Sequence, residues 1–135
     1  MRLNKYTFIS IIIIFELLVS LRTNAVTRGN TTRVTVTCYQ PVKAQCNGNP
    51  LVTADGSKID LNRLRRGKIK WCSVSRDLLK LFPKGKPKKI WIEGMGIYEV
   101  RDVMNKRFRR RVDILVHPKT GKLIYLNNVK IKIIS

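Results

Sequence analysis

Short segments in which apolar and polar residues alternate constrain the fold of this chain more than any other feature. In Arg33–Tyr39 the apolar residues alternate with threonines, which is the pattern of a β-strand with one buried face. Only Arg76–Phe82, which precedes Pro83, has the pattern of a helix. Further strands are expected over 71–75, 88–93, 94–102, 111–116, 122–126 and 129–133, with a short strand stub over 51–54.

About six or seven short strands and one short helix predict an all-β protein, a small barrel rather than a sheet that alternates with helices. The apolar residues at alternating positions should form the core of this barrel. They are Val34, Val36, Ile90, Ile92, Val100, Val112, Ile114, Ile131 and Ile133.

The chain has 135 residues and a formal net charge of +20, from 28 lysine and arginine residues and 8 aspartate and glutamate residues. This length suits one small domain with a single core. A charge this large predicts an anionic partner, which could be a nucleic acid, an acidic membrane surface or an anionic wall polymer. The charge alone does not distinguish these partners.

Residues 1–25 have the pattern of a secretory signal peptide. The basic segment Met1–Lys5 precedes an apolar run over Tyr6–Leu21, and small residues before position 26 predict cleavage after Ala25. An uncleaved membrane anchor is the alternative. The run is short for a membrane span, however, and it contains Glu16.

Cleavage at this point would leave a flexible lead-in over 26–32 and one domain over 33–135. We therefore expect a secreted or periplasmic protein with no membrane span after processing. Export weakens the hypothesis of a nucleic-acid partner, whereas an anionic wall polymer fits an exported basic protein.

Three cysteines and one histidine make a poor set of metal ligands, because no Cys-x-x-Cys spacing occurs. We expect neither a metal nor another cofactor, and we expect a monomer. Cys38 and Cys46 lie close together in the sequence, and they could form a disulfide in an oxidising compartment. Cys72 is expected to be a buried thiol.

Two aspartates stand on neighbouring predicted strands, which a basic loop over 103–110 connects. Tyr98, Val100 and Asp102 should share one face of the first strand, and Asp113 lies between apolar residues in the second. Apolar neighbours and a second carboxylate both raise the pKa of a carboxyl group, so such a pair can supply a proton donor. The alternative is that both aspartates cap backbone groups at turns or strand ends.

Several short motifs occur in the order found in a known family. These are Ser73-Val74-Ser75, Pro83-Lys84-Gly85, Ile90-Trp91-Ile92, Gly94-Met95-Gly96, Asp102, Val112-Asp113-Ile114 and the closing Val129–Ile133. Over about Thr35–Ile133 the chain resembles the three-aspartate (3D) domain family. This family includes the C-terminal barrel of membrane-bound lytic transglycosylase A and the stationary-phase survival muralytic proteins. Ser75 stands where the family has its first aspartate.

The resemblance implies a six-stranded double-psi β-barrel. It also implies cleavage of peptidoglycan glycan strands between N-acetylmuramic acid and N-acetylglucosamine, without water, which leaves a 1,6-anhydro end. By motif position Asp113 would act as acid and base, with Asp102 as its neighbour in the site. Asp55 resembles a rim residue of related barrels such as rare lipoprotein A. The residues expected to bind substrate are Asp55, Ser75, Gly94, Gly96, Tyr98, Asn105 and Arg111.

Two other functions stay open. A non-catalytic barrel of the expansin-like kind could bind an anionic wall polymer through the basic loop. Nucleic-acid binding is disfavoured, because the basic loop makes a poor stacking platform for bases. The expected partners are therefore peptidoglycan glycan strands or another anionic wall polymer, and no nucleic acid.

Overall fold

The computed structural model describes residues 30–46 and 48–134 of the chain. The expected signal peptide, its cleavage site after Ala25 and residues 26–29 of the expected lead-in lie outside these ranges. Within them, no helix is long and apolar enough to cross a membrane.

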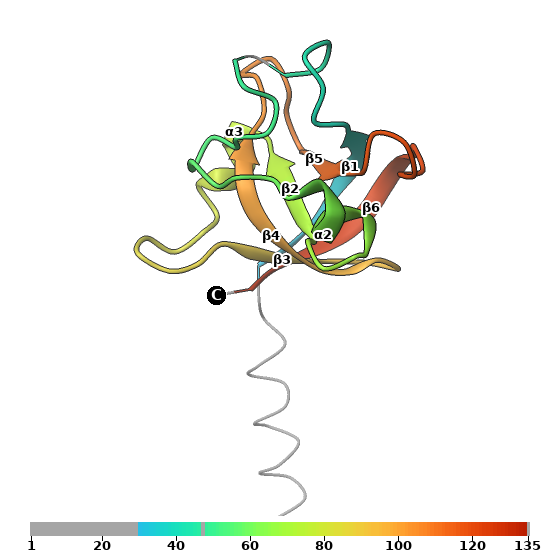
Figure 1. The fold of residues 1–135 in the computed structure, drawn as a ribbon. Helices are drawn as coiled ribbons and strands as arrows, with labels where there is room; N and C mark the ends of the chain where they lie inside the picture. Colours follow the sequence, from blue (N-terminus) through green and yellow to red (C-terminus); the bar gives the residue numbers. More distant parts are fainter. Residues whose placement is uncertain (1–29, 47, 135) are drawn as a thin grey trace, which may run out of the picture.

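Six strands in the described part of the chain close into a barrel (Figure 1). In chain order the elements are β1 (Thr31–Tyr39), α2 (Leu61–Arg65), β2 (Trp71–Val74), α3 (Arg76–Leu79), β3 (Lys89–Ile92), β4 (Gly96–Val103), β5 (Arg111–Leu115) and β6 (Tyr125–Ile134). Around the barrel the strands follow the order β1-β5-β2-β4-β3-β6. The prediction of an all-β, six-stranded barrel is confirmed.

The strand pairing has an internal two-fold pattern. β1 pairs in parallel with β5, and β2 pairs in parallel with β4, whereas the other four neighbouring pairs are antiparallel. If β1, β2 and β3 exchange places with β4, β5 and β6 respectively, every strand of the closed barrel keeps the same two neighbours. The two halves of the barrel therefore pair in the same way.

Alternate residues of every strand fill the barrel interior. All nine residues that the sequence predicted for the core are buried. Cys72, predicted to be a buried thiol, is fully buried among them, and burial raises its pKa. Leu78 and Phe82, from α3 and the turn after it, add to this core.

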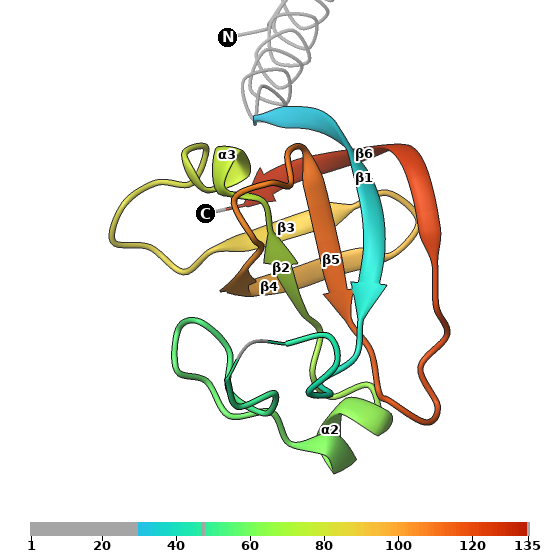
Figure 2. The same cartoon turned by 90° about the horizontal axis from the view of Figure 1, so that it is seen from above.

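A second apolar cluster lies outside the barrel wall. Tyr39 of β1 and Leu115 of β5 pack there with Ile59, Leu64 and Ile69. Leu64 belongs to α2, so this helix and its flanking segments cover one part of the outer face. Figure 2 shows α2 on the same side of the barrel as the segment over 40–60, where β1 and β5 end and β2 begins.

Two short helices occur in the described residues, whereas one was expected. The unexpected helix α2 lies in a basic segment for which the sequence predicted neither a helix nor a strand. Asp60 caps it, because its carboxylate accepts hydrogen bonds from the backbone N–H groups of Asn62 and Arg63.

The expected helix over 76–82 is shorter than predicted, because α3 ends at Leu79. Ser75 occupies its N-cap position, but its side chain does not cap the helix. Instead its Oγ accepts a hydrogen bond from the backbone N–H of Arg111 at 3.1 Å, which joins the end of β2 to the start of β5.

One continuous strand, β6, replaces the two strands expected over 122–126 and 129–133. Within β6, Asn128 has a φ of 56°, a conformation that asparagine adopts more readily than most residues. A register shift between Val34 and Val36 of β1 faces this position.

Two smaller predictions were wrong. The stub expected over 51–54 is not a strand, since only Val52 forms a bridge, with Lys58. The lead-in expected over 26–32 overlaps β1, because Thr31 and Thr32 already pair with β6.

Candidate active site

Four polar residues form a row across the outer face of the barrel wall. Thr37 of β1 pairs with Asp113 of β5, Asp113 pairs with Ser73 of β2, and Ser73 pairs with Asp102 of β4. The residues on either side of Ser73 and of Asp113 belong to the core. Because side chains alternate along a strand, the row faces outward.

A bulge in β4 places Asp102 on this face. The register between β2 and β4 shifts after Val100, so that Arg101 is an extra residue and Asp102 pairs with Ser73. The sequence predicted that Asp102 shares a face with Tyr98 and Val100. That prediction is wrong, since Val100 is buried in the core while Asp102 lies beside Ser73 on the outside.

Asp113 is half-buried, and among the described residues a single hydrogen bond holds its side chain. Its Oδ1 accepts from Thr37 Oγ1 at 2.7 Å, and among the described residues no donor bonds to Oδ2. Burial raises the pKa of Asp113, the Thr37 hydrogen bond and the Arg111 charge lower it, and the Asp102 charge raises it further. The net result is a pKa above the usual value, in spite of Arg111.

Asp102 accepts more hydrogen bonds than Asp113. Its Oδ1 accepts from the backbone N–H groups of Ala54 at 3.0 Å and Val103 at 2.9 Å, and its Oδ2 accepts from Tyr39 Oη at 3.4 Å. Burial, followed by the Asp102 charge, strongly raises the pKa of Tyr39, so this residue remains a neutral hydroxyl donor. Asp102 therefore anchors the segment that contains Ala54 to the barrel wall.

A groove of about 760 Å³ opens at the aspartate row, and we call it the aspartate groove. The segment after β1, which Figure 2 shows beside the ends of β1 and β5, contributes one side of its lining. The loop after β4 and residues of β1, β2, β4 and β5 contribute the rest. The lining includes Tyr39, Lys43, Cys46, Ala54, Ser73, Asp102, Asn105, Arg107, Phe108 and Asp113.

Three of the predicted site residues meet in this groove, namely Asp113, Asp102 and Asn105. Ser75 and Arg111 follow next along the same outer face, but they do not line the groove. Arg111 stacks on Phe108, with its guanidinium carbon 4.8 Å from the ring centre. The first residue of β5 therefore contacts an aromatic ring of the basic loop.

Gly94, Gly96 and Tyr98 lie at the other end of β4. The two glycines form the turn between β3 and β4, with φ values of 76° and 92° that favour glycine. Tyr98 packs against the core, and the Lys70 amine lies 4.7 Å above its ring. Along a strand Gly96 is about 20 Å from Asp102. None of these three residues lines the aspartate groove.

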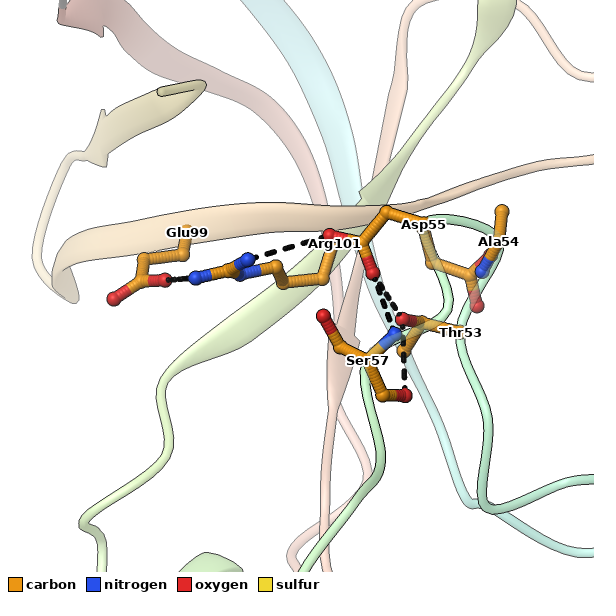
Figure 3. A network of polar contacts seen from close by, with 7 residues as sticks. Thr53, Ala54, Asp55, Ser57, Glu99 and Arg101 are labelled. Carbon is orange, nitrogen blue, oxygen red and sulfur yellow. Dashed lines mark hydrogen bonds and ion pairs between the residues drawn. The ribbon is translucent and has the colours of Figure 1, made fainter. Parts of the chain in front are cut away.

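Asp55 does not line the aspartate groove itself, but it stabilises the turn that contributes Ala54 to the lining (Figure 3). Its Oδ1 accepts hydrogen bonds from Thr53 Oγ1 at 2.6 Å and from the Ser57 backbone N–H at 3.0 Å, and its Oδ2 pairs with Arg101 at 3.4 Å. Burial raises the pKa of Asp55, but the hydrogen bonds from Ser57, Thr53 and Arg101 outweigh it and lower the pKa to about 2. Asp55 is an ionised anchor of the turn that carries Ala54.

Thr37, Tyr39 and Ser73 belong to the site, although the sequence pattern did not single them out as site residues. Thr37 and Tyr39 come from β1, and only the parallel pairing with β5 brings them beside Asp113. No local pattern predicts such a pairing between distant segments. Ser73 did carry a signal, since it is a polar residue between two core positions of a predicted strand.

Among the described residues, no three histidine, cysteine, aspartate or glutamate side chains are grouped so that they could hold a metal ion. The disulfide that the sequence allowed is not formed, because Cys38 and Cys46 are both free thiols. Cys38 Sγ accepts from the Ile124 backbone N–H at 3.0 Å, and Cys46 Sγ donates to the Gln40 carbonyl at 3.6 Å.

Comparisons with protein-family models, with curated proteins and with solved structures found no match.

Proposed function

We propose that this protein is a secreted peptidoglycan lytic transglycosylase, which cleaves the glycan strand between N-acetylmuramic acid and N-acetylglucosamine with Asp113 as acid and base. The resemblance to the 3D family motivates the substrate, and the signal-peptide pattern of residues 1–25 motivates the compartment. We also propose that the barrel is of the double-psi type. The two-fold pattern of its strand pairing supports this topology.

The raised pKa of Asp113 and its unbonded carboxyl oxygen are the main support for this proposal. A general acid has to keep its proton near the working pH, and the raised pKa of Asp113 moves it in that direction. Thr37 orients one carboxyl oxygen, while no described residue bonds to the other. The unbonded oxygen, Oδ2, is therefore available to a ligand in the groove.

The proposed reaction uses one carboxyl group twice. Protonated Asp113 donates its proton to the glycosidic oxygen as the bond from that oxygen to C1 of the muramic acid breaks. The 6-hydroxyl of the same sugar then bonds to C1, and its proton returns to the Asp113 carboxylate. The products are a free hydroxyl on the leaving strand and a 1,6-anhydro ring, with Asp113 protonated as at the start.

Asp102 has a supporting role in this scheme. Its charge contributes to the raised pKa of Asp113, and its hydrogen bonds hold Ala54 and Tyr39 at the groove. The groove volume of about 760 Å³ lies within the range of small-molecule sites, about 300–1,000 Å³. A short segment of glycan could therefore lie against the aspartates.

A non-catalytic wall-binding barrel is the second candidate. It is favoured by Ser75, which stands where the 3D family has its first aspartate. It is also favoured by the bonding of Asp102, since a carboxylate that accepts three hydrogen bonds also serves as a structural anchor. Lys43 and Arg107 in the groove lining could then bind anionic groups of the polymer.

Purified protein incubated with peptidoglycan sacculi tests the proposal, with mass spectrometry of the released fragments. The wild type should release anhydromuropeptides, and Asp113→Asn should release none. Asp102→Asn should retain partial activity, because Asp102 raises the pKa of Asp113 and holds Ala54 and Tyr39 at the groove but does not itself transfer the proton. Asp60→Asn is the matched control, because it removes a carboxylate that does not line the groove and asparagine also caps helices.

Equal turnover by the wild type and Asp113→Asn would remove Asp113 from the mechanism. Binding to sacculi without turnover by either protein would favour the non-catalytic barrel.

A further inference from the structure

A second groove, of about 440 Å³, lies on the outer face of β2, β3 and β4, and we call it the basic groove. Five cationic side chains line it, and Glu99 is the single carboxylate of its lining. The five are Arg63, Lys68, Lys70, Lys89 and Arg101. This surface is distinct from the basic loop over 103–110.

Most of the positive charge in the basic groove is not neutralised. Glu99 is paired with Arg101 at 2.6 Å, and Arg101 also bonds to Asp55. Within the described part of the chain, the side chains of Arg63, Lys68 and Lys89 make no ion pair and no hydrogen bond, and all three residues are exposed. Exposed like charges around a concave surface attract anions and raise their local concentration.

The aromatic surface in this groove is already occupied. Trp71 packs against the second apolar cluster, and the Arg101 guanidinium carbon lies 5.5 Å from the centre of its ring. Nearby, the Lys70 amine covers the ring of Tyr98. Single-stranded nucleic acids bind by stacking bases on open aromatic faces, and this groove offers none. An anionic ligand without aromatic rings suits it better.

The basic groove and the aspartate groove adjoin one another. Trp71 lines the first and Ser73 the second, about 7 Å apart along β2. On β4, Arg101 lines the first and the next residue, Asp102, lines the second. Figure 3 shows Arg101 reaching across to the turn that carries Ala54. One linear polymer could therefore contact both grooves.

We propose that the basic groove binds oxyanion groups, carboxylate or phosphate, of an acidic polysaccharide. The anion preference rests on the groove itself. The polysaccharide character of the ligand rests on the proposed function.

Calorimetric titration with defined oligomers tests this proposal. The probes are hexagalacturonate for carboxylates, an oligomer of glycerol phosphate for phosphates, neutral chitohexaose, and a thymidylate oligomer as the nucleic acid. The wild type should bind at least one of the two acidic probes, with an affinity that falls as salt is added. Binding of only one would identify the oxyanion. Chitohexaose should bind more weakly than that acidic probe.

A triple variant that removes the unpaired charges, Arg63→Gln, Lys68→Gln and Lys89→Gln, should bind the acidic probe about tenfold more weakly. The matched control is Lys84→Gln, Lys86→Gln and Lys122→Gln, which removes the same charge from exposed positions elsewhere. The control should bind within about twofold of the wild type. All six side chains are exposed, and equal thermal unfolding should confirm that both variants fold.

Equal losses in the two triple variants would overturn the proposal, because binding would then depend only on net charge. Tighter binding of the thymidylate oligomer, or no binding of either acidic probe, would overturn it too. Retained binding without release of anhydromuropeptides would refute the proposed cleavage while leaving the basic groove intact.

Discussion

Replacing Asp55 with asparagine should destabilise the protein by an amount that depends on pH. A pKa lowered from 3.8 to about 2 corresponds to about 2.5 kcal/mol of stability if it is fully expressed. The side chains of Arg101 and Asp55 are 40% and 39% exposed, however, so solvent screens their interaction and we expect about 1 kcal/mol. For a domain of this size, the melting temperature should fall by about 4 °C.

The direction of the pH dependence follows from the lowered pKa. Because the folded protein holds the Asp55 proton less tightly than the unfolded chain, the stabilisation is present above pH 3.8 and is lost as pH falls through about 2. Thermal unfolding followed by circular dichroism should therefore show wild type and Asp55→Asn converging in acid. Asp60→Asn serves as the control and should follow the wild type. If Asp55→Asn has the same melting temperature as the wild type at neutral pH, the network in Figure 3 does not stabilise the turn.

Three further predictions concern other parts of the molecule. The pKa of Asp113 is raised in the folded protein, so the stability that this carboxyl group contributes falls as pH rises above its ordinary pKa. Asp113→Asn should therefore melt at or above the wild-type temperature at neutral pH and lose this advantage below about pH 4. A lower melting temperature of Asp113→Asn at neutral pH would contradict this. Ile90 is fully buried, so Ile90→Ala should lower the free energy of unfolding in urea by about 2–5 kcal/mol. Ile97 is 51% exposed, so Ile97→Ala should lower it by about 0.5 kcal/mol or less. Equal losses would refute the assigned core. Exported protein should begin at Val26 by intact-mass analysis, and a full-length product would refute the signal peptide.

The barrel core was predictable because it depends on a local pattern. Val34 and Val36, or Ile90 and Ile92, alternate with polar residues, and a strand with one buried face requires that alternation. The helix α2 was missed for the opposite reason. Of its five residues only Leu64 is buried, so its pattern resembles a basic loop.

The site was only partly predictable, because its geometry depends on pairing between distant strands. Asp102 and Asp113 were identified, but the bulge at Arg101 that turns Asp102 outward reflects the register of β4 against β2. Thr37 reaches Asp113 through parallel pairing of β1 and β5, which leaves no trace in either segment. Asp55 was expected at the substrate, and its hydrogen bonds instead assign it to a turn.

The proposed mechanism requires the barrel to retain the proton on Asp113, and a carboxyl-carbon NMR titration measures this directly. The Asp113 resonance, assigned by its loss in Asp113→Asn, should titrate above the ordinary value of 3.8, while Asp55 should titrate near 2. This experiment needs no substrate. An Asp113 pKa at or below 3.8 would contradict its role as the acid.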